Sequence, residues 1–100
     1  MDDTPFRKRA LAMHGVSEVR HFARRAYRRR VIFASLAPDG RTANLRLPPE
    51  RQADLAERFP HALASVPNKW GERGWTTLTL RHAEPSEVEY LLKIAFDAAG

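Results

Sequence analysis

Six arginines occur within the eleven residues from Arg20 to Arg30, and no acidic residue interrupts them. Positive charges this close together repel one another unless an anion lies opposite them. An arginine cluster in a small protein points first to phosphate-bearing partners, above all to nucleic acid. The alternative is compositional, because fourteen of the seventeen basic residues are arginine, a bias that a GC-rich genome produces whatever the function. Successive strand residues also face opposite sides, so the run need not form one patch.

The positive charge is concentrated in the first half of the chain. Residues 1–49 hold eleven Lys and Arg against four Asp and Glu, whereas residues 50–100 hold six against eight. A length of 100 residues suits one domain, spanning 1–100. The absence of cysteine excludes disulfides, thiolate metal sites and thiol nucleophiles. The apolar runs are too short to span a bilayer and the N-terminus lacks a signal-peptide profile, so we expect a cytoplasmic protein without membrane association.

Apolar periodicity, prolines and glycines predict the order helix, strands, helix, strand, helix. The predicted elements are a helix from a Thr4 cap to Gly15, strands over 17–23 and 27–37, a turn at 38–40, a strand over 42–47, a helix over 49–59, a short strand-like stretch over 63–66, a strand over 75–81 and a helix that opens at Pro85. The last helix has the spacing of a capping box at Ser86 and Glu89.

This order predicts an α+β fold of two layers, with helices packed on one face of a mostly antiparallel sheet. The outward residues of the predicted strands are polar, so the other face should contact water. With Trp75, that face would carry Asn44, Arg46, Thr77, Thr79 and Arg81. A polar face with arginine and an aromatic residue suits a binding surface; the alternative is an ordinary solvated face.

The segment Trp70-Gly-Glu-Arg-Gly-Trp75 is the most specific string in the sequence. Its two glycines allow positive φ and predict a tight loop that leads into the strand beginning at Trp75. Lys69 and Arg73 would lie at the tip of this loop, where they can reach a phosphate. The alternative for Trp70 is a structural role, in which the indole packs the loop onto the helices.

Five segments, in their order and spacing, together carry a family resemblance: residues 10–18 (ALAMHGVSE), His21-Phe22, residues 31–36 (VIFASL), residues 44–49 (NLRLPP) and residues 68–76 (NKWGERGWT). Through them the chain resembles the MmcQ/YjbR-like family of small bacterial proteins over nearly its whole length. The resemblance implies a two-layer α+β domain with a frataxin-related, CyaY-like topology. It also implies a DNA-binding role, without an assigned enzymatic activity.

The first hairpin departs most from the family pattern. Members typically have Leu-Pro-Gly-Val where this chain has Met13-His14-Gly15-Val16, and the glycine that often follows His-Phe is Ala23 here. Arginine-rich residues 24–30 replace the glycine-containing turn between the first two strands. Phosphate affinity should therefore exceed that of a typical member.

These observations predict a DNA-binding protein with double-stranded DNA as its partner, no cofactor, no metal and no catalytic residue. The arginine-rich first hairpin and the Trp-Gly loop would contact phosphates, and binding should depend strongly on salt because each neutralised phosphate releases counterions. If the target is single-stranded, Tyr27 or Trp70 could stack on a base. The predicted binding residues are Arg24, Arg25, Arg28, Arg29, Arg30, Arg46, Lys69, Arg73, Trp75 and Arg81.

The main alternative is a regulatory adaptor, a monomer or weak dimer that docks an acidic protein on the open sheet face. An exposed, unpaired sheet edge would favour it. The frataxin-like topology also raises iron handling, but the first helix and strand hold few acids among many basic residues, and the four histidines lack ligand spacing. For an enzyme, the one candidate is an acid–base pair of Glu18 and His21, whose alternative role is backbone bonding at a strand edge.

Overall fold

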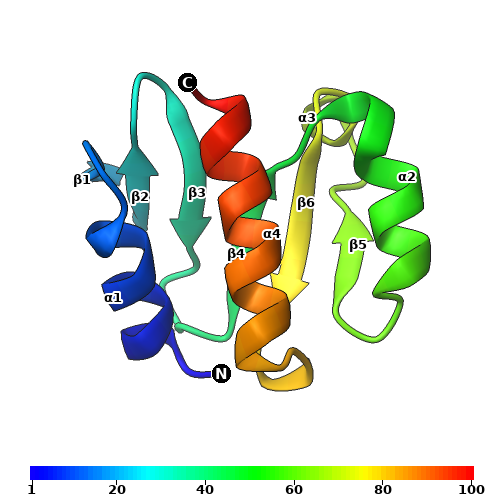
Figure 1. The fold of residues 1–100 in the computed structure, drawn as a ribbon, viewed down its shortest axis with the longest axis horizontal. Coiled ribbons are helices and arrows are strands. Elements are labelled where there is room, and N and C mark those ends of the chain that lie inside the picture. Colours follow the sequence, from blue (N-terminus) through cyan, green and yellow to red (C-terminus); the bar gives the residue numbers. More distant parts are fainter.

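Six antiparallel strands form one sheet in the computed structural model, which describes residues 1–100 (Figure 1). The strands are β1 (Ser17–His21), β2 (Arg24–Arg28), β3 (Ile32–Leu36), β4 (Thr42–Arg46), β5 (Leu63–Ser65) and β6 (Trp75–Thr79), in the spatial order β1-β2-β3-β4-β6-β5. The helices are α1 (Asp3–Ala12), α2 (Pro49–Arg58), α3 (Lys69–Glu72) and α4 (Pro85–Ala98). The predicted α+β class with an antiparallel sheet is therefore confirmed. No helix is both long enough and apolar enough to cross a membrane.

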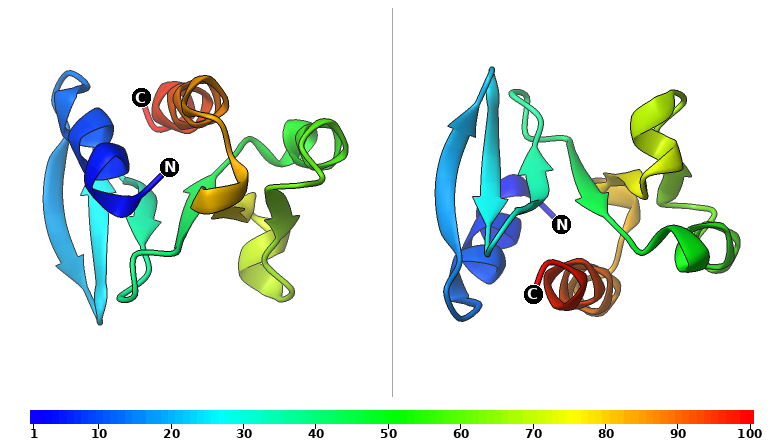
Figure 2. Two further views of the ribbon diagram at one scale, coloured as in Figure 1. Left: turned by 90° about the horizontal axis from the view of Figure 1, so that it is seen from below. Right: turned by 90° about the horizontal axis from the view of Figure 1, so that it is seen from above.

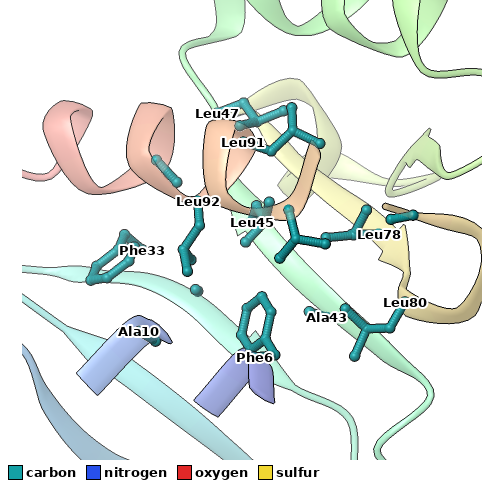
Figure 3. Packing of buried hydrophobic residues seen from close by; sticks show 14 of the residues in the cluster. Phe6, Ala10, Phe33, Ala43, Leu45, Leu47, Leu78, Leu80, Leu91 and Leu92 are labelled. Carbon is teal, nitrogen blue, oxygen red and sulfur yellow. The ribbon is translucent and has the colours of Figure 1, made fainter. Parts of the chain in front are cut away.

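The core lies between the sheet and the three longer helices. Figure 2 shows α1, α2 and α4 on one face of the sheet and the short α3 on the other. In Figure 3, Phe6 from α1 and Leu91 and Leu92 from α4 gather around Leu45 of the central strand β4. All four of these side chains are fully buried. The alternation predicted over 42–47 is confirmed, because Ala43, Leu45 and Leu47 are buried.

The arginine run folds differently from its predicted pattern. The strand predicted over 27–37 is two strands, because β2 begins at Arg24 and β3 begins only at Ile32. Tyr27 holds β2 in place, since its fully buried ring packs edge-on against Phe6 with 6.1 Å between ring centroids. The first turn lies at Phe22 and the residue after it. This turn contains no glycine, proline, Asn or Asp, so the sequence carried no turn signal there.

The predicted helix ends also require correction. The first helix begins at Asp3 after an extended Asp2, so Thr4 is not its cap. Pro5 fits as the third helical residue, where a backbone N–H has no partner within the helix. The strand predicted over 75–81 ends at Thr79, and residues 80–82 form a 3-10 turn.

The capping box of the last helix is shifted from the predicted pair, Ser86 and Glu89. Pro85 occupies the first helical position, so Glu84 is the N-cap residue. The Glu84 backbone N–H donates to Glu87 Oε1 over 2.9 Å, which completes the reciprocal arrangement.

The two glycines of the tryptophan loop serve different purposes. Gly74 has φ 103°, as predicted, and a Cβ there would also overlap the carbonyl oxygen of Leu47. Gly71 does not have positive φ, so that part of the prediction is wrong. It is required because a Cβ would overlap the carbonyl oxygen of Val66. Close backbone packing therefore fixes the loop before Trp75.

We expect Gly74→Ala to lower the free energy of unfolding by more than about 1 kcal/mol, because overlap at Leu47 adds to positive-φ strain. Gly15 offers a matched control, since its φ is 76° but nothing lies near the place of its Cβ. Gly15→Ala therefore measures strain alone. Urea denaturation of both variants gives the comparison, and equal losses would contradict the role assigned to close packing at Leu47.

A hydrogen-bonded cluster joins α1 to the first hairpin. Arg7 Nε donates to Glu18 Oε1 over 2.6 Å, and the Tyr27 hydroxyl donates to the same oxygen over 3.1 Å. The hydrogen bond from Arg7 lowers the pKa of Glu18 below its ordinary value, partial desolvation opposes this, and the bond from Tyr27 adds to the lowering. Burial, together with the bond to Glu18, raises the pKa of Tyr27. The ionised carboxylate of Glu18 thus stabilises the packing of α1 against the β1–β2 hairpin.

Stability should depend on pH through Glu18. Its folded-state pKa is depressed, so its contribution is fully present above the ordinary Glu pKa of about 4.3 and is lost as pH falls below that value. We expect the difference in unfolding free energy between the native protein and Glu18→Gln to be largest near neutral pH and to shrink in acid. Glu57→Gln, which breaks no ion pair, controls for the loss of one carboxylate. A difference in unfolding free energy that does not change with pH would contradict this account.

Candidate nucleic-acid interface

A groove of about 700 Å³ crosses the sheet face that α1, α2 and α4 leave uncovered. In Figure 2 the β1–β2 turn projects on one side of this face and α3 on the other, both away from α4. Strands β2, β3, β4 and β6 contribute to its floor. The lining residues are His21, Arg24, Arg28, Arg30, Val31, Ile32, Ser35, Asn44, Arg46, Val66, Asn68, Trp70, Arg73 and Trp75.

The groove is positively charged and lacks any internal counter-ion. Five of its lining residues are arginines and none is a carboxylate. The ion pairs of the protein all lie elsewhere, joining Arg7 to Glu18, Arg9 to Glu89, His61 to Glu87 and Lys93 to Asp97. An anionic ligand would therefore neutralise charges that the protein leaves unpaired.

Strand alternation decides which arginines reach the groove. Arg24 and Arg28 of β2 line it, whereas Arg25 lies on the helix side of the strand with Tyr27. Arg29 is also turned away, because its Nη1 donates to the Phe96 carbonyl oxygen over 3.1 Å. Its guanidinium carbon lies 4.0 Å from the centroid of the Phe96 ring. The arginine run is therefore divided between ligand-facing and fold-stabilising positions.

Arg24 is held in position by the neighbouring strand. Its Nε donates to Ser35 Oγ over 2.8 Å, and its Nη2 donates to the Ser35 carbonyl oxygen over 3.3 Å. Burial lowers the pKa of the Arg24 guanidinium below its ordinary value, and Asp39 offsets part of that effect. Such a group is already oriented before a ligand arrives, so binding costs less side-chain entropy.

Both tryptophans line the groove. Trp70 on α3 is 56% exposed and lies beside Arg73, whose guanidinium carbon is 5.2 Å from the ring centroid. The proposed packing of Trp70 onto the helices is therefore wrong, because α3 lies on the opposite face of the sheet. Trp75 is half-buried and pairs in register with Arg46 of β4. An arginine thus lies over the Trp70 indole and another is the cross-strand neighbour of Trp75.

A buried polar cluster fixes the strand that carries Trp75. Gln52 of α2 donates through Nε2 to the Trp75 carbonyl oxygen over 3.1 Å and to Thr76 Oγ1 over 3.0 Å. Thr76 Oγ1 in turn donates to the Gly74 carbonyl oxygen over 3.0 Å. The helix layer on one face therefore positions a groove residue on the other.

Six of the ten predicted binding residues line the groove, namely Arg24, Arg28, Arg30, Arg46, Arg73 and Trp75. The other four, Arg25, Arg29, Lys69 and Arg81, do not. Sequence reasoning did not select His21 and Asn68 as binding residues. Both lie in segments that carry the family resemblance, His21-Phe22 and residues 68–76, but neither is an arginine, a lysine or a tryptophan, the residue types on which the binding prediction was based.

Two further sequence hypotheses are contradicted. Glu18 bonds Arg7 and Tyr27 on the helix side, whereas His21 lines the groove, so they form no acid–base pair. Tyr27 is fully buried and cannot stack on a base. The structure brings together no three His, Asp or Glu side chains that could hold a metal ion.

Phe22 is an exposed aromatic residue at the β1–β2 turn, beside the groove. It is 87% exposed and has φ 57°, a conformation that is uncommon for bulky residues. Its ring contacts the His21 ring edge-on, with 4.8 Å between centroids. Together with Val31 and Trp70, it places three of the four large exposed hydrophobic side chains in or beside the groove.

Fold and groove define a small α+β protein with one open, basic sheet face. The family model YjbR matches residues 11–98, so the chain belongs to the YjbR family. No curated protein matches it. A Deinococcus radiodurans crystal structure, described by the domain name DUF419, has a TM-score of 0.73 at 19% identity, covering 94% of this chain and 79% of that one. A Pseudomonas syringae protein has a TM-score of 0.73 at 16% identity, covering 100% of both chains. These two likenesses concern the fold alone.

Proposed function

We propose that the protein binds DNA through the groove, by phosphate contacts and without catalysis. One observation carries this proposal: five guanidinium groups share a concave surface that contains no carboxylate. Guanidinium groups form strong, often paired, charge-assisted hydrogen bonds with phosphate oxygens. The proposal narrows the contact surface from the whole arginine-rich hairpin to the residues that face the groove. A cytoplasmic location and a CyaY-like topology stay predictions.

An acidic protein is the second candidate partner. Strand β1 is an edge of the sheet and pairs only with β2, which leaves its outer backbone groups free. Such an edge can accept a strand from a partner. The groove favours DNA over this alternative, because its charges lie on the sheet face, where the backbone of an added edge strand would not reach them.

A triple substitution tests the groove against the overall charge of the protein. We expect Arg28→Ser, Arg30→Ser and Arg73→Ser together to weaken binding of a labelled oligonucleotide and to reduce the slope of log affinity against log salt by about 2 to 3. The physical reason is the loss of up to three phosphate contacts. Fluorescence anisotropy between about 50 mM and about 200 mM salt measures both quantities.

The matched control replaces Arg25, Arg41 and Arg81 with serine. It has the same net charge as the groove variant, but none of these residues lines the groove. We expect a much smaller change in affinity and slope. Equal effects in the two triple variants would show that binding follows net charge, and would overturn the assignment of the groove.

A further inference from the structure

We infer that the ligand of the groove is single-stranded nucleic acid, with unpaired bases stacked on Trp70 and Trp75. This inference rests on the proposed function and replaces the sequence-based expectation of double-stranded DNA. The inference concerns whether the bound nucleic acid is single-stranded or double-stranded, which phosphate contacts alone do not decide.

The placement of the aromatic side chains is the first argument. The chain has only two tryptophans, and both line the groove. At 56% exposure, Trp70 keeps much of its indole surface accessible to a ligand in the groove. Stacking needs the flat face of a base, which a duplex hides between neighbouring pairs and a single strand exposes.

Pairing of indole and guanidinium groups is the second argument. Arg73 lies over the Trp70 ring, and Arg46 is the cross-strand neighbour of Trp75. A stacked base has its own phosphate nearby, so an arginine beside each indole suits successive nucleotides of one strand. Sequence-tolerant single-strand binders combine a basic groove with aromatic stacking in this way.

The shape of the site is the third argument. Proteins that read duplex DNA insert a convex helix or ribbon into the major groove. Here the arginines line a concavity between the β1–β2 turn and α3, on a molecule of only 29 × 25 × 24 Å. A volume of about 700 Å³ falls in the range of sites that enclose small ligands, so it suits a few nucleotides.

The floor also offers polar groups to a base or phosphate. Asn44 Oδ1 accepts a hydrogen bond from Thr77 Oγ1 over 3.0 Å, which directs its amide nitrogen elsewhere. That nitrogen has no hydrogen-bond partner in the protein, because the Thr77 contact is the only one that the Asn44 side chain makes. The side chain lies in the groove, so the amide is available to an incoming strand.

Three probes of similar length separate the contribution of base stacking from that of phosphate contacts. We would titrate the protein at low salt with an oligothymidine of about 16 nucleotides, the abasic chain of equal charge, and the corresponding duplex. Because both tryptophans lie in the groove, intrinsic fluorescence reports stacking directly. We expect oligothymidine to quench it and to bind at least about fivefold more tightly than either the abasic chain or the duplex.

Trp70→Ala supplies the residue-level test, and the exposure of Trp70 makes misfolding a small risk. We expect this variant to bind oligothymidine at least about fivefold more weakly and the abasic chain unchanged. Tyr90→Ala is the control, because Tyr90 is also exposed but lies on α4 away from the groove. Trp75→Phe keeps a ring at the second position and should reduce the quenching with a smaller loss of affinity.

Different results would contradict the single-strand inference and the proposed DNA binding. Duplex binding as tight as oligothymidine binding, without fluorescence quenching, would overturn the single-strand inference and leave DNA binding in place. Absence of binding to all three probes at low salt would overturn both. Polyglutamate that binds more tightly than oligothymidine would also overturn both and indicate an acidic protein partner.

Discussion

One-sided burial of the sheet is the constraint on which the rest of the structure depends. Three helices pack on one face of six antiparallel strands, and most strand residues that point toward them are apolar, the exceptions being Glu18, Arg25 and Thr76. Because side chains alternate along a strand, the residues between them must point the other way. No long helix covers that second face, so arginines and other polar residues can lie there beside a few apolar ones such as Trp75. The groove follows from this arrangement together with the projecting β1–β2 turn and α3.

The same alternation limits the repulsion among the arginines. Of the consecutive pair Arg28 and Arg29, one faces the groove and the other packs over Phe96 at the end of α4. Arg24 is anchored on Ser35 of the adjacent strand. The remaining unpaired charges make the groove the part of the molecule whose electrostatics improve most when an anion binds. One arginine run thus contains both residues that line the groove and a residue, Arg29, that stabilises the fold.

The sequence predicted the periodic parts of this molecule well. The alternation over 42–47 follows from the two-residue period of strand burial, and the turn at 38–40 follows from the turn preferences of Pro, Asp and Gly. It failed at the first hairpin, where a strand made largely of arginine is stabilised by Tyr27, whose burial depends on Phe6 of α1. A local pattern cannot reveal a partner so distant in sequence. The same limit explains why Arg29, which packs over Phe96 of α4, was assigned to the binding surface.

Charge on the helix layer has a consequence for how quickly a ligand is found. The three long helices α1, α2 and α4 carry seven carboxylates against six Lys and Arg, so their charges nearly cancel, whereas the five arginines of the groove lie across the sheet from them without a carboxylate. The protein therefore has an electric dipole roughly along the normal to the sheet. In the field of a polyanion, this dipole turns the groove toward the approaching charge before contact, so a larger share of encounters is productive. A helix layer with almost no net charge preserves this asymmetry, which would in this way raise the association rate.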